Sequence, residues 1–254
     1  MSEKSEGTPC WADLITRDPR TSQKFYGTLF GWTFQTGSSG EITDYIYAYK
    51  DGALVAGLLS SDPDETGAEG WVTYLKVENV EATVNSAAMH AGSIYLNPTY
   101  VPTQGSMAMI GEPSGHGVGL WENGEHPEFE ARGVPGAPVW HELRSGTFES
   151  TTSFYEKVLG WQLRCFNDHR EAHYHVLGEH FDLQTAVRDF THAPEREAGW
   201  HIYFQVADIQ DALDAVTNLG GHIIKRAHAG TLGLTAEGTD PLGTAFSIVE
   251  PVMA

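Results

Sequence analysis

The stretch WHELRSGTFESTTSFYEKVLGW, residues 140–161, repeats the pattern of an earlier stretch, WADLITRDPRTSQKFYGTLFGW, residues 11–32. An offset of 129 residues, from Trp11 to Trp140, aligns the two stretches and continues beyond them. The landmarks that align at this offset are Pro9 with Pro138, Phe25 with Phe154, Gly31 with Gly160, and Trp71 with Trp200. Self-similarity over this length is typical of a duplicated domain.

The similarity extends to the far end of each copy. EPSGHGVGLWE, residues 112–122, matches DPLGTAFSIVE, residues 240–250, once a single deletion is allowed. The sequence therefore predicts two similar domains, the first copy at residues 9–122 and the second copy at residues 138–250. Residues 123–137, NGEHPEFEARGVPGA, are polar and contain Gly and Pro, which is typical of a linker.

Each copy divides again into two modules with the same order of elements. Residues 11–32 begin with an alternating strand and continue into a helix that Pro19 leads and Gly31 stops. Alternating residues then predict two or three strands, and residues 71–92 repeat the order of strand and helix. The sequence therefore predicts an α+β fold of four tandem βαβββ modules, two in each domain.

Charge and composition limit the kinds of partner. The chain of 254 residues has a formal net charge of −19, and such a field repels the phosphate backbone of nucleic acids. No apolar run approaches the roughly 18 residues of a membrane helix, and MSEKSEGTPCW lacks the apolar stretch of a signal peptide. We therefore expect a cytoplasmic monomer or homodimer that binds a small molecule, and neither nucleic acid nor membranes.

Several motifs resemble those of a known family. The helix ends FYGTLFGW and FYEKVLGW, the DPLG turn before a last strand, and the helix opening VADIQDALDA resemble the vicinal oxygen chelate superfamily. This superfamily contains glyoxalase I, bleomycin-resistance proteins and extradiol dioxygenases. The resemblance covers nearly the whole chain, and it implies two similar domains in which a curled mixed sheet forms a cleft with the helices outside. It also implies a metal wherever four strand positions in the cleft supply His, Glu or Gln.

The ligand positions that the resemblance implies do not carry a complete metal-binding set. His201 stands at the third position, but Trp140 stands at the first and Ser247 at the last. The first copy has Trp11, Val72 and Gly119 at these positions. We therefore expect no resident cofactor.

An alternative site uses His141, His201 and Glu250. Two histidines and one carboxylate suit Fe(II), Mn(II) or Zn(II) and leave positions open for substrate or oxygen. Because His141 and Glu250 lie an odd number of residues from the expected positions, both are expected to point away from the cleft unless the strands bulge. Glu122 also matches Glu250 in a copy that lacks the histidines, which favours a structural role for both glutamates.

Alternation along the strands predicts the side chains that line the second cleft. They are Trp140, Glu142 and Arg144 from one strand, His201, Tyr203 and Gln205 from another, and Gln184 from the third module. The first cleft has Trp11 and Asp13 opposite Tyr74 and Lys76. We predict catalytic roles for His201, Glu142 and Tyr203. The predicted ligand-binding residues are Trp140, Arg144, Gln184, Gln205, Trp11, Asp13 and Tyr74. The alternative is that Glu142 with Arg144, and Asp13 with Lys76, are only ion pairs.

A carboxylate, an imidazole and a phenol beside a tryptophan suit acid–base chemistry on a flat, partly apolar ligand. The sequence therefore predicts an enzyme that acts on an aromatic or natural-product-like molecule, as an isomerase, lyase or oxygenase, in the second copy. One alternative is a protein that sequesters a drug or metabolite, as bleomycin-resistance members do. Another is a metal-dependent extradiol-type dioxygenase.

His173 and His175 share a strand face that could bind a metal. A hairpin rich in His, Asp and Glu is, however, more often only a solvated edge.

Overall fold

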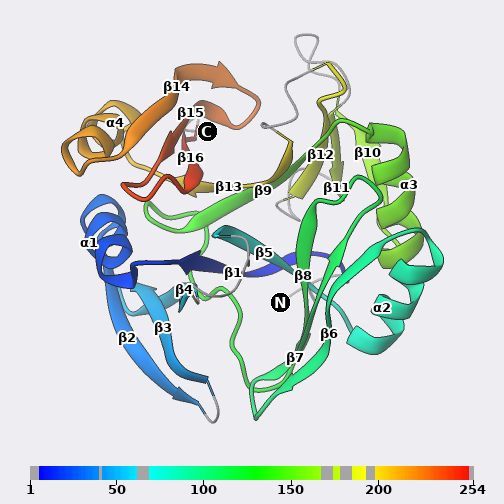
Figure 1. Ribbon diagram of the computed structural model, residues 1–254. Coiled ribbons are helices and arrows are strands. Elements are labelled where there is room, and N and C mark those ends of the chain that lie inside the picture. The colour runs from blue at the N-terminus through cyan, green and yellow to red at the C-terminus, as the bar shows by residue number, and fades with distance from the viewer. Residues whose placement is uncertain are drawn as a thin grey trace. The chain divides into compact units, whose positions relative to one another are not determined.

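The computed structural model describes residues 6–39, 42–61, 69–166, 174–177, 185–192 and 198–251. Four helices and sixteen strands lie in these ranges (Figure 1). The helices are α1 (Pro19–Phe30), α2 (Val80–Met89), α3 (Phe148–Leu159) and α4 (Ile209–Asn218). The strands of the first copy are β1 (Pro9–Thr16), β2 (Trp32–Ser39), β3 (Ile42–Lys50), β4 (Ala53–Ser60), β5 (Gly70–Lys76), β6 (Ser93–Val101), β7 (Gly105–Gly111) and β8 (Gly117–Asn123). The strands of the second copy are β9 (Pro138–Ser145), β10 (Leu163–Cys165), β11 (Tyr174–Leu177), β12 (Thr185–Asp189), β13 (Gly199–Gln205), β14 (His222–Gly230), β15 (Gly233–Thr239) and β16 (Ala245–Glu250).

The strands form two mixed sheets of eight strands each, one from each copy. Their orders are β2-β3-β4-β1-β5-β8-β7-β6 and β10-β11-β12-β9-β13-β16-β15-β14, so the second sheet repeats the topology of the first. The first strand of a copy pairs in parallel with the fourth, as β1 does with β4, whereas the hairpin strands pair antiparallel. The α+β fold of duplicated βαβββ modules is confirmed. The domain boundaries at residues 9–122 and 138–250 stay a prediction.

The chain also divides into two compact units, and each unit takes one module from each copy. The first unit comprises the described parts of Met1–Cys10, Val72–His126 and His141–His201, and the second those of Trp11–Trp71, Pro127–Trp140 and Ile202–Ala254. Helices α2 and α3 lie together in the first unit, and α1 and α4 lie together in the second (Figure 1). A module therefore packs its helix against a helix from the other copy.

Local sequence explains where the helices begin and end. The carboxylate of Asp18 accepts hydrogen bonds from the backbone N–H groups of Arg20 and Thr21 at the start of α1. Gly31 and Gly160 follow α1 and α3 in the left-handed conformation, with φ of 71° and 65°. Only glycine adopts this conformation at little cost, so the predicted helix stop at Gly31 is confirmed.

The core of the first unit fixes the orientation of β9. Side chains from α2 and α3 pack there against β5, β7, β8 and β9, and Leu143 of β9 is fully buried among them. Successive side chains of a strand point to opposite faces. Glu142 and Arg144 therefore lie on the face of β9 that is turned away from α2 and α3.

A buried carboxylate also stabilises the first unit. Glu112 accepts hydrogen bonds from Ser114 N, from Thr151 Oγ1 and from Ser114 Oγ, and its Oε1 lies 2.8 Å from His116 Nδ1. Burial raises the pKa of Glu112, but the hydrogen bonds from His116 and Ser114 outweigh it and lower the pKa to about 2. Glu112 is therefore an ionised structural group at neutral pH.

Rings fill the core of the second unit. The aromatic side chains that contact one another there are Phe25, Tyr26, Phe30, Trp32, Trp71, Phe204 and Phe246. Phe204 and Phe246 belong to the second copy, and the other five residues belong to the first. The two copies therefore share a single aromatic core in this unit.

The segment between the copies packs onto the second unit. Phe129 is only 6% exposed, and its ring centroid lies 5.6 Å from that of Trp11. The guanidinium of Arg132 lies 5.1 Å from the same ring. Glu130 N donates to Leu54 O at 2.9 Å, and Leu54 N donates to Glu130 Oε2 at 2.9 Å. Residues 127–137 therefore form a fixed part of this unit.

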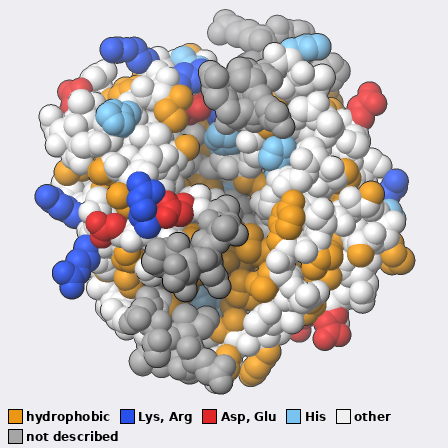
Figure 2. All heavy atoms as spheres, in the orientation of Figure 1, with side chains coloured by type: hydrophobic (Ala, Val, Ile, Leu, Met, Phe, Trp, Pro, Cys, Tyr) orange, Lys and Arg blue, Asp and Glu red, His pale blue; other side chains and the backbone are white. Residues whose placement is uncertain are grey.

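Strand β6 forms one edge of the first sheet and exposes apolar side chains. Tyr95 and Tyr100 are 53% and 68% exposed, and Figure 2 shows hydrophobic side chains over the region of β6 to β8. The pairing of β6 with β7 is irregular between Ile94 and Leu96 and again between Leu96 and Thr99. Such irregularities, together with Pro98, make an edge a poor template for a further strand.

None of the helices in the described part of the chain has the length and hydrophobicity that a membrane span requires.

Candidate functional site

A buried ion cluster lies on the face of β9 and β12 that is turned away from α2 and α3. Arg144 Nε donates to Glu142 Oε1 at 2.8 Å, and both residues are almost completely buried, at 1% and 2% exposure. In the parallel pairing of the two strands, Arg188 lies opposite Arg144. Arg188 Nη1 is 3.9 Å from the same Glu142 oxygen. Two guanidinium groups therefore share one carboxylate.

The neighbouring charges decide the protonation state of Glu142. Burial raises the pKa of this carboxyl group, but the charges of Arg144, Arg188 and His201 outweigh the effect of burial and hold the pKa below its ordinary value. Glu142 is therefore a carboxylate at neutral pH. A carboxylate of lowered pKa is a weak base, so it suits an orienting role better than the acid–base role that the sequence predicts.

Phe190 holds the two arginines beside Glu142. The guanidinium carbons of Arg144 and Arg188 lie 5.3 Å and 5.2 Å from the centroid of its ring, which is cation–π distance. Neither Arg188 nor Phe190 is among the predicted site residues. At the 129-residue offset the first copy has Leu59 and Ser61 in their places, so a comparison of the copies could have found them.

His201 completes the part of the site that belongs to the first unit. It lies on β13, is half-buried, and is close enough for its charge to lower the pKa of Glu142. The structure therefore brings together Glu142, Arg144 and His201 of the predicted set, and adds Arg188. We call these four residues the Glu142 cluster.

Other predicted residues of the second cleft belong to the second unit. Tyr203 is buried and lies opposite Ser247 in the parallel pairing of β13 with β16. Trp140 is buried as well. Gln205 contributes to a pocket of about 270 Å³ whose other residues include Leu29, Phe30, Lys50, Asp208 and Asp211. Gln184 and His173 lie outside the described residues, and the ring of His175 contacts Phe148, with 4.9 Å between the ring centroids.

His141 and Glu250, two residues of the alternative metal site, each take part in another hydrogen bond. His141 shares a face of β9 with Leu143, on the helix side, and its Nδ1 lies 3.0 Å from Thr73 Oγ1. Glu250 Oε2 accepts from Ile209 N, the first residue of α4, at 2.8 Å. In the first copy Glu122 does the same for Val80 N of α2, so both glutamates cap a helix.

The last ligand position that the resemblance implies carries a hydroxyl group. Ser247, at the last ligand position that the resemblance implies, has a buried hydroxyl oxygen without a hydrogen-bond partner. Within the described ranges, no three His, Cys, Asp or Glu side chains lie together so that they could hold a metal ion. The absence of a resident metal stays a prediction.

In the first copy, Trp11 and Asp13 stand at the positions of Trp140 and Glu142, and they are hydrogen-bonded to each other. Trp11 Nε1 and Tyr45 OH donate to Asp13 Oδ1, at 3.0 Å and 2.6 Å. Phe129 packs against the ring of Trp11. In the other module, a Cβ at Gly119 would lie 2.2 Å from the ring of Tyr74, so Tyr74 occupies the space of the last ligand position.

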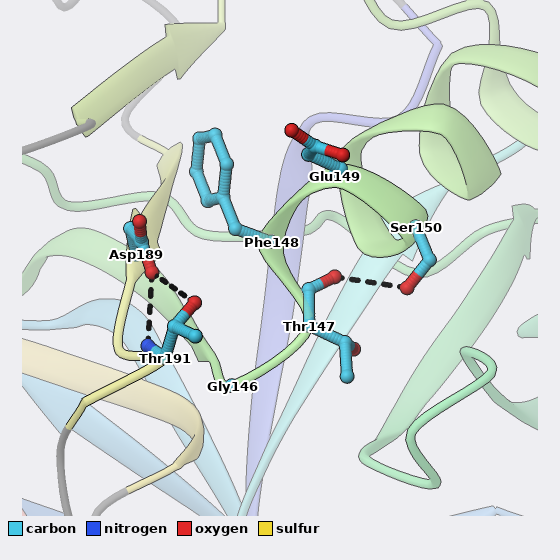
Figure 3. A pocket seen from close by; sticks show the side chains of 7 residues that line it. All are labelled: Gly146, Thr147, Phe148, Glu149, Ser150, Asp189 and Thr191. Atoms are coloured by element: carbon cyan, nitrogen blue, oxygen red, sulfur yellow. Dashed lines mark hydrogen bonds between the residues drawn. The ribbon is translucent and has the colours of Figure 1, made fainter.

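A pocket of about 450 Å³ lies beside the Glu142 cluster in the first unit (Figure 3). It is lined by Gly146, Thr147, Phe148, Glu149 and Ser150 at the start of α3, and by Asp189 and Thr191 after β12. Figure 3 shows Asp189 accepting hydrogen bonds from the backbone N and the Oγ1 of Thr191. Because Asp189 directly follows Arg188, its side chain points to the opposite face of β12. The pocket and the cluster are therefore separate, and the sequence did not indicate the pocket.

Comparisons with known proteins agree with this geometry. Residues 10–120 match the model of the Glyoxalase/Bleomycin resistance protein/Dioxygenase superfamily, and residues 143–249 match that of the Glyoxalase-like domain. The chain is 30% identical to the "Putative glyoxylase CFP32" of Mycobacterium tuberculosis (strain CDC 1551 / Oshkosh), over 98% of this chain and 97% of that protein. It is 27% identical to the anthracycline biosynthesis protein DauV of Streptomyces sp. (strain C5), over 98% of this chain and 95% of that protein.

Solved structures share the fold. The 2,3-dioxygenase LapB from Pseudomonas sp. KL28 superposes with a TM-score of 0.64 at 14% identity, covering 97% of this chain and 93% of its own. The Mn(II)-bound glyoxalase from Novosphingobium aromaticivorans also gives 0.64, at 16% identity, covering 100% of this chain and 84% of its own. At these identities the likeness shows the fold alone.

Proposed function

The chain belongs to the Glyoxalase/Bleomycin resistance protein/Dioxygenase superfamily, and from this premise we propose that it is an enzyme that transfers a proton on a small aromatic or natural-product-like molecule. The site of the reaction is the Glu142 cluster in the second copy, on the face of β9 that is turned away from α2 and α3. The observation that carries this proposal is the Glu142 cluster, of which only the carboxylate has a counterpart of the same chemistry in the first copy. The equivalent residues there are Asp13, Ile15, Leu59 and Val72.

The cost of burying these charges supports a functional role. A buried ion pair is often no more stabilising than apolar residues of similar volume. The first copy has Ile15 and Leu59 where the second has Arg144 and Arg188, and both copies form sheets of the same topology. The fold therefore does not require the charges, and an interaction with a ligand offsets their cost.

In this proposal His201 moves the proton. Its imidazole accepts a proton from a substrate carbon at a ring nitrogen. Returning it to a different atom of the same molecule gives an isomerisation, and donating it to a leaving group as the bond to that group breaks gives an elimination. Glu142 remains a carboxylate throughout, orients the imidazole and compensates its charge. Arg144 holds Glu142 in place.

The named relatives support the substrate class. Two Streptomyces relatives are described as anthracycline biosynthesis proteins and two mycobacterial ones as glyoxylases, and they match this chain along nearly its whole length. A natural-product-like substrate is consistent with the first description. Proton transfer next to a carbonyl group is consistent with both.

The test compares variants of the two copies. Conversion of a panel of phenolic and quinone compounds, followed by mass spectrometry, finds a substrate, and turnover is then measured for each variant. His201→Ala is expected to reduce turnover by about 10²–10⁴-fold, the usual effect of losing a general base. Asp13→Asn and Tyr74→Phe, the matched changes in the first copy, are expected to leave it within about threefold.

Two results would contradict the proposal. If Asp13→Asn abolishes turnover while His201→Ala does not, the chemistry lies in the first copy. If no compound is converted and Trp140→Ala only weakens the binding of an aromatic ligand, the protein is a sequestering binder of the bleomycin-resistance kind.

A further inference from the structure

We propose that the edge strand β6 and the adjoining end of α2 are the docking surface for a second copy of this chain, so that the protein forms a symmetric homodimer. The exposed side chains there are Met89 at the end of α2 and Tyr95, Leu96 and Tyr100 on β6, and we call these four residues the β6 surface. Two copies related by a two-fold axis present the same surface to each other, so every contact between them occurs twice.

The stretch of chain that contains the β6 surface carries almost no charge. Residues 91–111, which include β6 and β7, contain no Asp, Glu, Lys, Arg or His, although 19% of the whole chain is charged. The centres of protein interfaces are enriched in tyrosine and methionine and depleted of charged residues. An exposed group of such side chains is typical of a surface that associates with another protein.

The equivalent edge of the second copy is charged. Strand β14 ends the second sheet as β6 ends the first. At the 129-residue offset, Leu96 and Asn97 correspond to Lys225 and Arg226, which are both exposed. Charged side chains on an edge strand, lysine above all, are the usual protection against association with another chain. The topology therefore accommodates this protection, and the first copy has neutral side chains in its place.

The charge of the whole chain indicates which partner fits this surface. With a formal net charge of −19, two copies of the chain repel each other at long range. A basic partner would dock on an acidic surface, because opposite charges attract. At an uncharged surface two copies meet with the least repulsion, since no like charges are brought into contact there. A second copy is therefore the partner that the β6 surface fits.

Side chains, and not a continued sheet, hold the two copies together. The pairing of β6 with β7 is irregular between Ile94 and Leu96 and again between Leu96 and Thr99, and Pro98 has no N–H group to donate. A backbone ladder from one copy to the other is therefore interrupted. The affinity of the dimer then depends on individual exposed side chains, and substituting one of them is expected to change it strongly.

The experiment measures the mass and the dissociation constant of the full chain by sedimentation velocity over a range of protein concentrations. The wild-type protein is expected to reach twice the mass of one chain. Leu96→Lys introduces the residue that β14 has at this place and is expected to weaken the dimer at least about tenfold. Because this variant is less negative than the wild-type chain, long-range repulsion decreases, and the weakening must come from the contact itself. Tyr100→Glu adds a carboxylate to the contact in each copy and is expected to weaken the dimer at least about 100-fold.

Ile224→Glu is the matched control, because Ile224 is exposed on β14 at the place that corresponds to Tyr95 on β6. This variant is expected to keep the wild-type dissociation constant within about threefold. Circular dichroism of each variant verifies that it is folded. The inference is wrong if the wild-type protein is a monomer at every concentration, or if Leu96→Lys and Tyr100→Glu leave the dimer intact. It is also wrong if Ile224→Glu weakens the dimer as much as they do.

Salt provides a second readout of the same dimer. Raising the NaCl concentration from about 0.05 M to about 0.5 M screens the repulsion between the two acidic chains, so the wild-type dimer is expected to become tighter. A dimer that becomes weaker instead would be held by ion pairs, which the β6 surface does not supply, and would contradict the inference.

Discussion

Replacing Glu142 with leucine should destabilise the protein, and replacing Arg144 as well should restore most of the loss. Both side chains are almost completely buried and hydrogen-bonded to each other, so Glu142→Leu leaves a guanidinium without its carboxylate in a site that water barely reaches. Removing one partner of such a pair costs about 3–5 kcal/mol. The double variant Glu142→Leu with Arg144→Ile removes both buried charges and leaves Arg188, whose side chain is 20% exposed to water, so it is expected to cost less than about 1.5 kcal/mol.

The assay is urea unfolding, followed by both tryptophan fluorescence and circular dichroism because the chain has two compact units. The free energy of unfolding of the double variant should exceed that of Glu142→Leu by at least about 1.5 kcal/mol. If the two substitutions acted independently, the second would instead lower it further. A double variant that is less stable than Glu142→Leu would refute the reasoning, because Arg144 would then be stabilised by contacts other than Glu142. Glu142→Gln keeps an acceptor oxygen for Arg144 and should cost only about 1–2 kcal/mol.

Other predictions concern both units. Because the folded pKa of Glu112 is about 2 and its ordinary value is 4.5, its contribution of roughly 3 kcal/mol is complete above pH 4.5 and is lost as the pH falls towards 2. Glu112→Gln should remove this part of the pH dependence of unfolding, and an unchanged acid limb would contradict the assignment. Phe129→Ala should lower the free energy of unfolding by about 3–5 kcal/mol and alter Trp11 fluorescence, whereas a loss below about 1 kcal/mol would show that the segment is not packed. Elemental analysis of protein purified without a histidine tag should give no stoichiometric iron, manganese or zinc, and one metal per chain that His201→Ala removes would overturn the expected site chemistry.

The fold could be predicted because the same local signals occur twice. The helix ends at Gly31 and Gly160 both require a left-handed residue, and the distance from the second helix back to its strand places Glu142 and Arg144 on one face. Leu143 in the helix-side core agrees with that register. Helix ends and strand alternation are local properties, so one sequence suffices to find them.

The pairing of modules into compact units could not be predicted in the same way. Each helix has an apolar face, but its pattern does not say which other helix covers that face. Phe154 of α3 packs in one core with Val84 of α2, although these helices belong to different copies. The buried state of Phe129 was hidden for a similar reason, since a single apolar residue among glutamates is typical of a solvated linker.

Arg188 and Phe190 escaped prediction because of the segment that precedes them. Residues 178–184, GEHFDLQ, do not alternate regularly, so counting through them does not fix the face on which Arg188 lies. The pairing of Arg188 with Arg144 fixes it directly. A comparison of the two copies could have indicated the site, since the aligned strand of the first copy has the apolar Leu59 where the second copy has the charged Arg188.

The first copy also indicates what kind of group Trp140 receives. Its equivalent, Trp11, packs against the phenyl ring of Phe129, and the guanidinium of Arg132 lies over the same ring. An aromatic ring is therefore the partner that this strand position accepts when the chain itself supplies one.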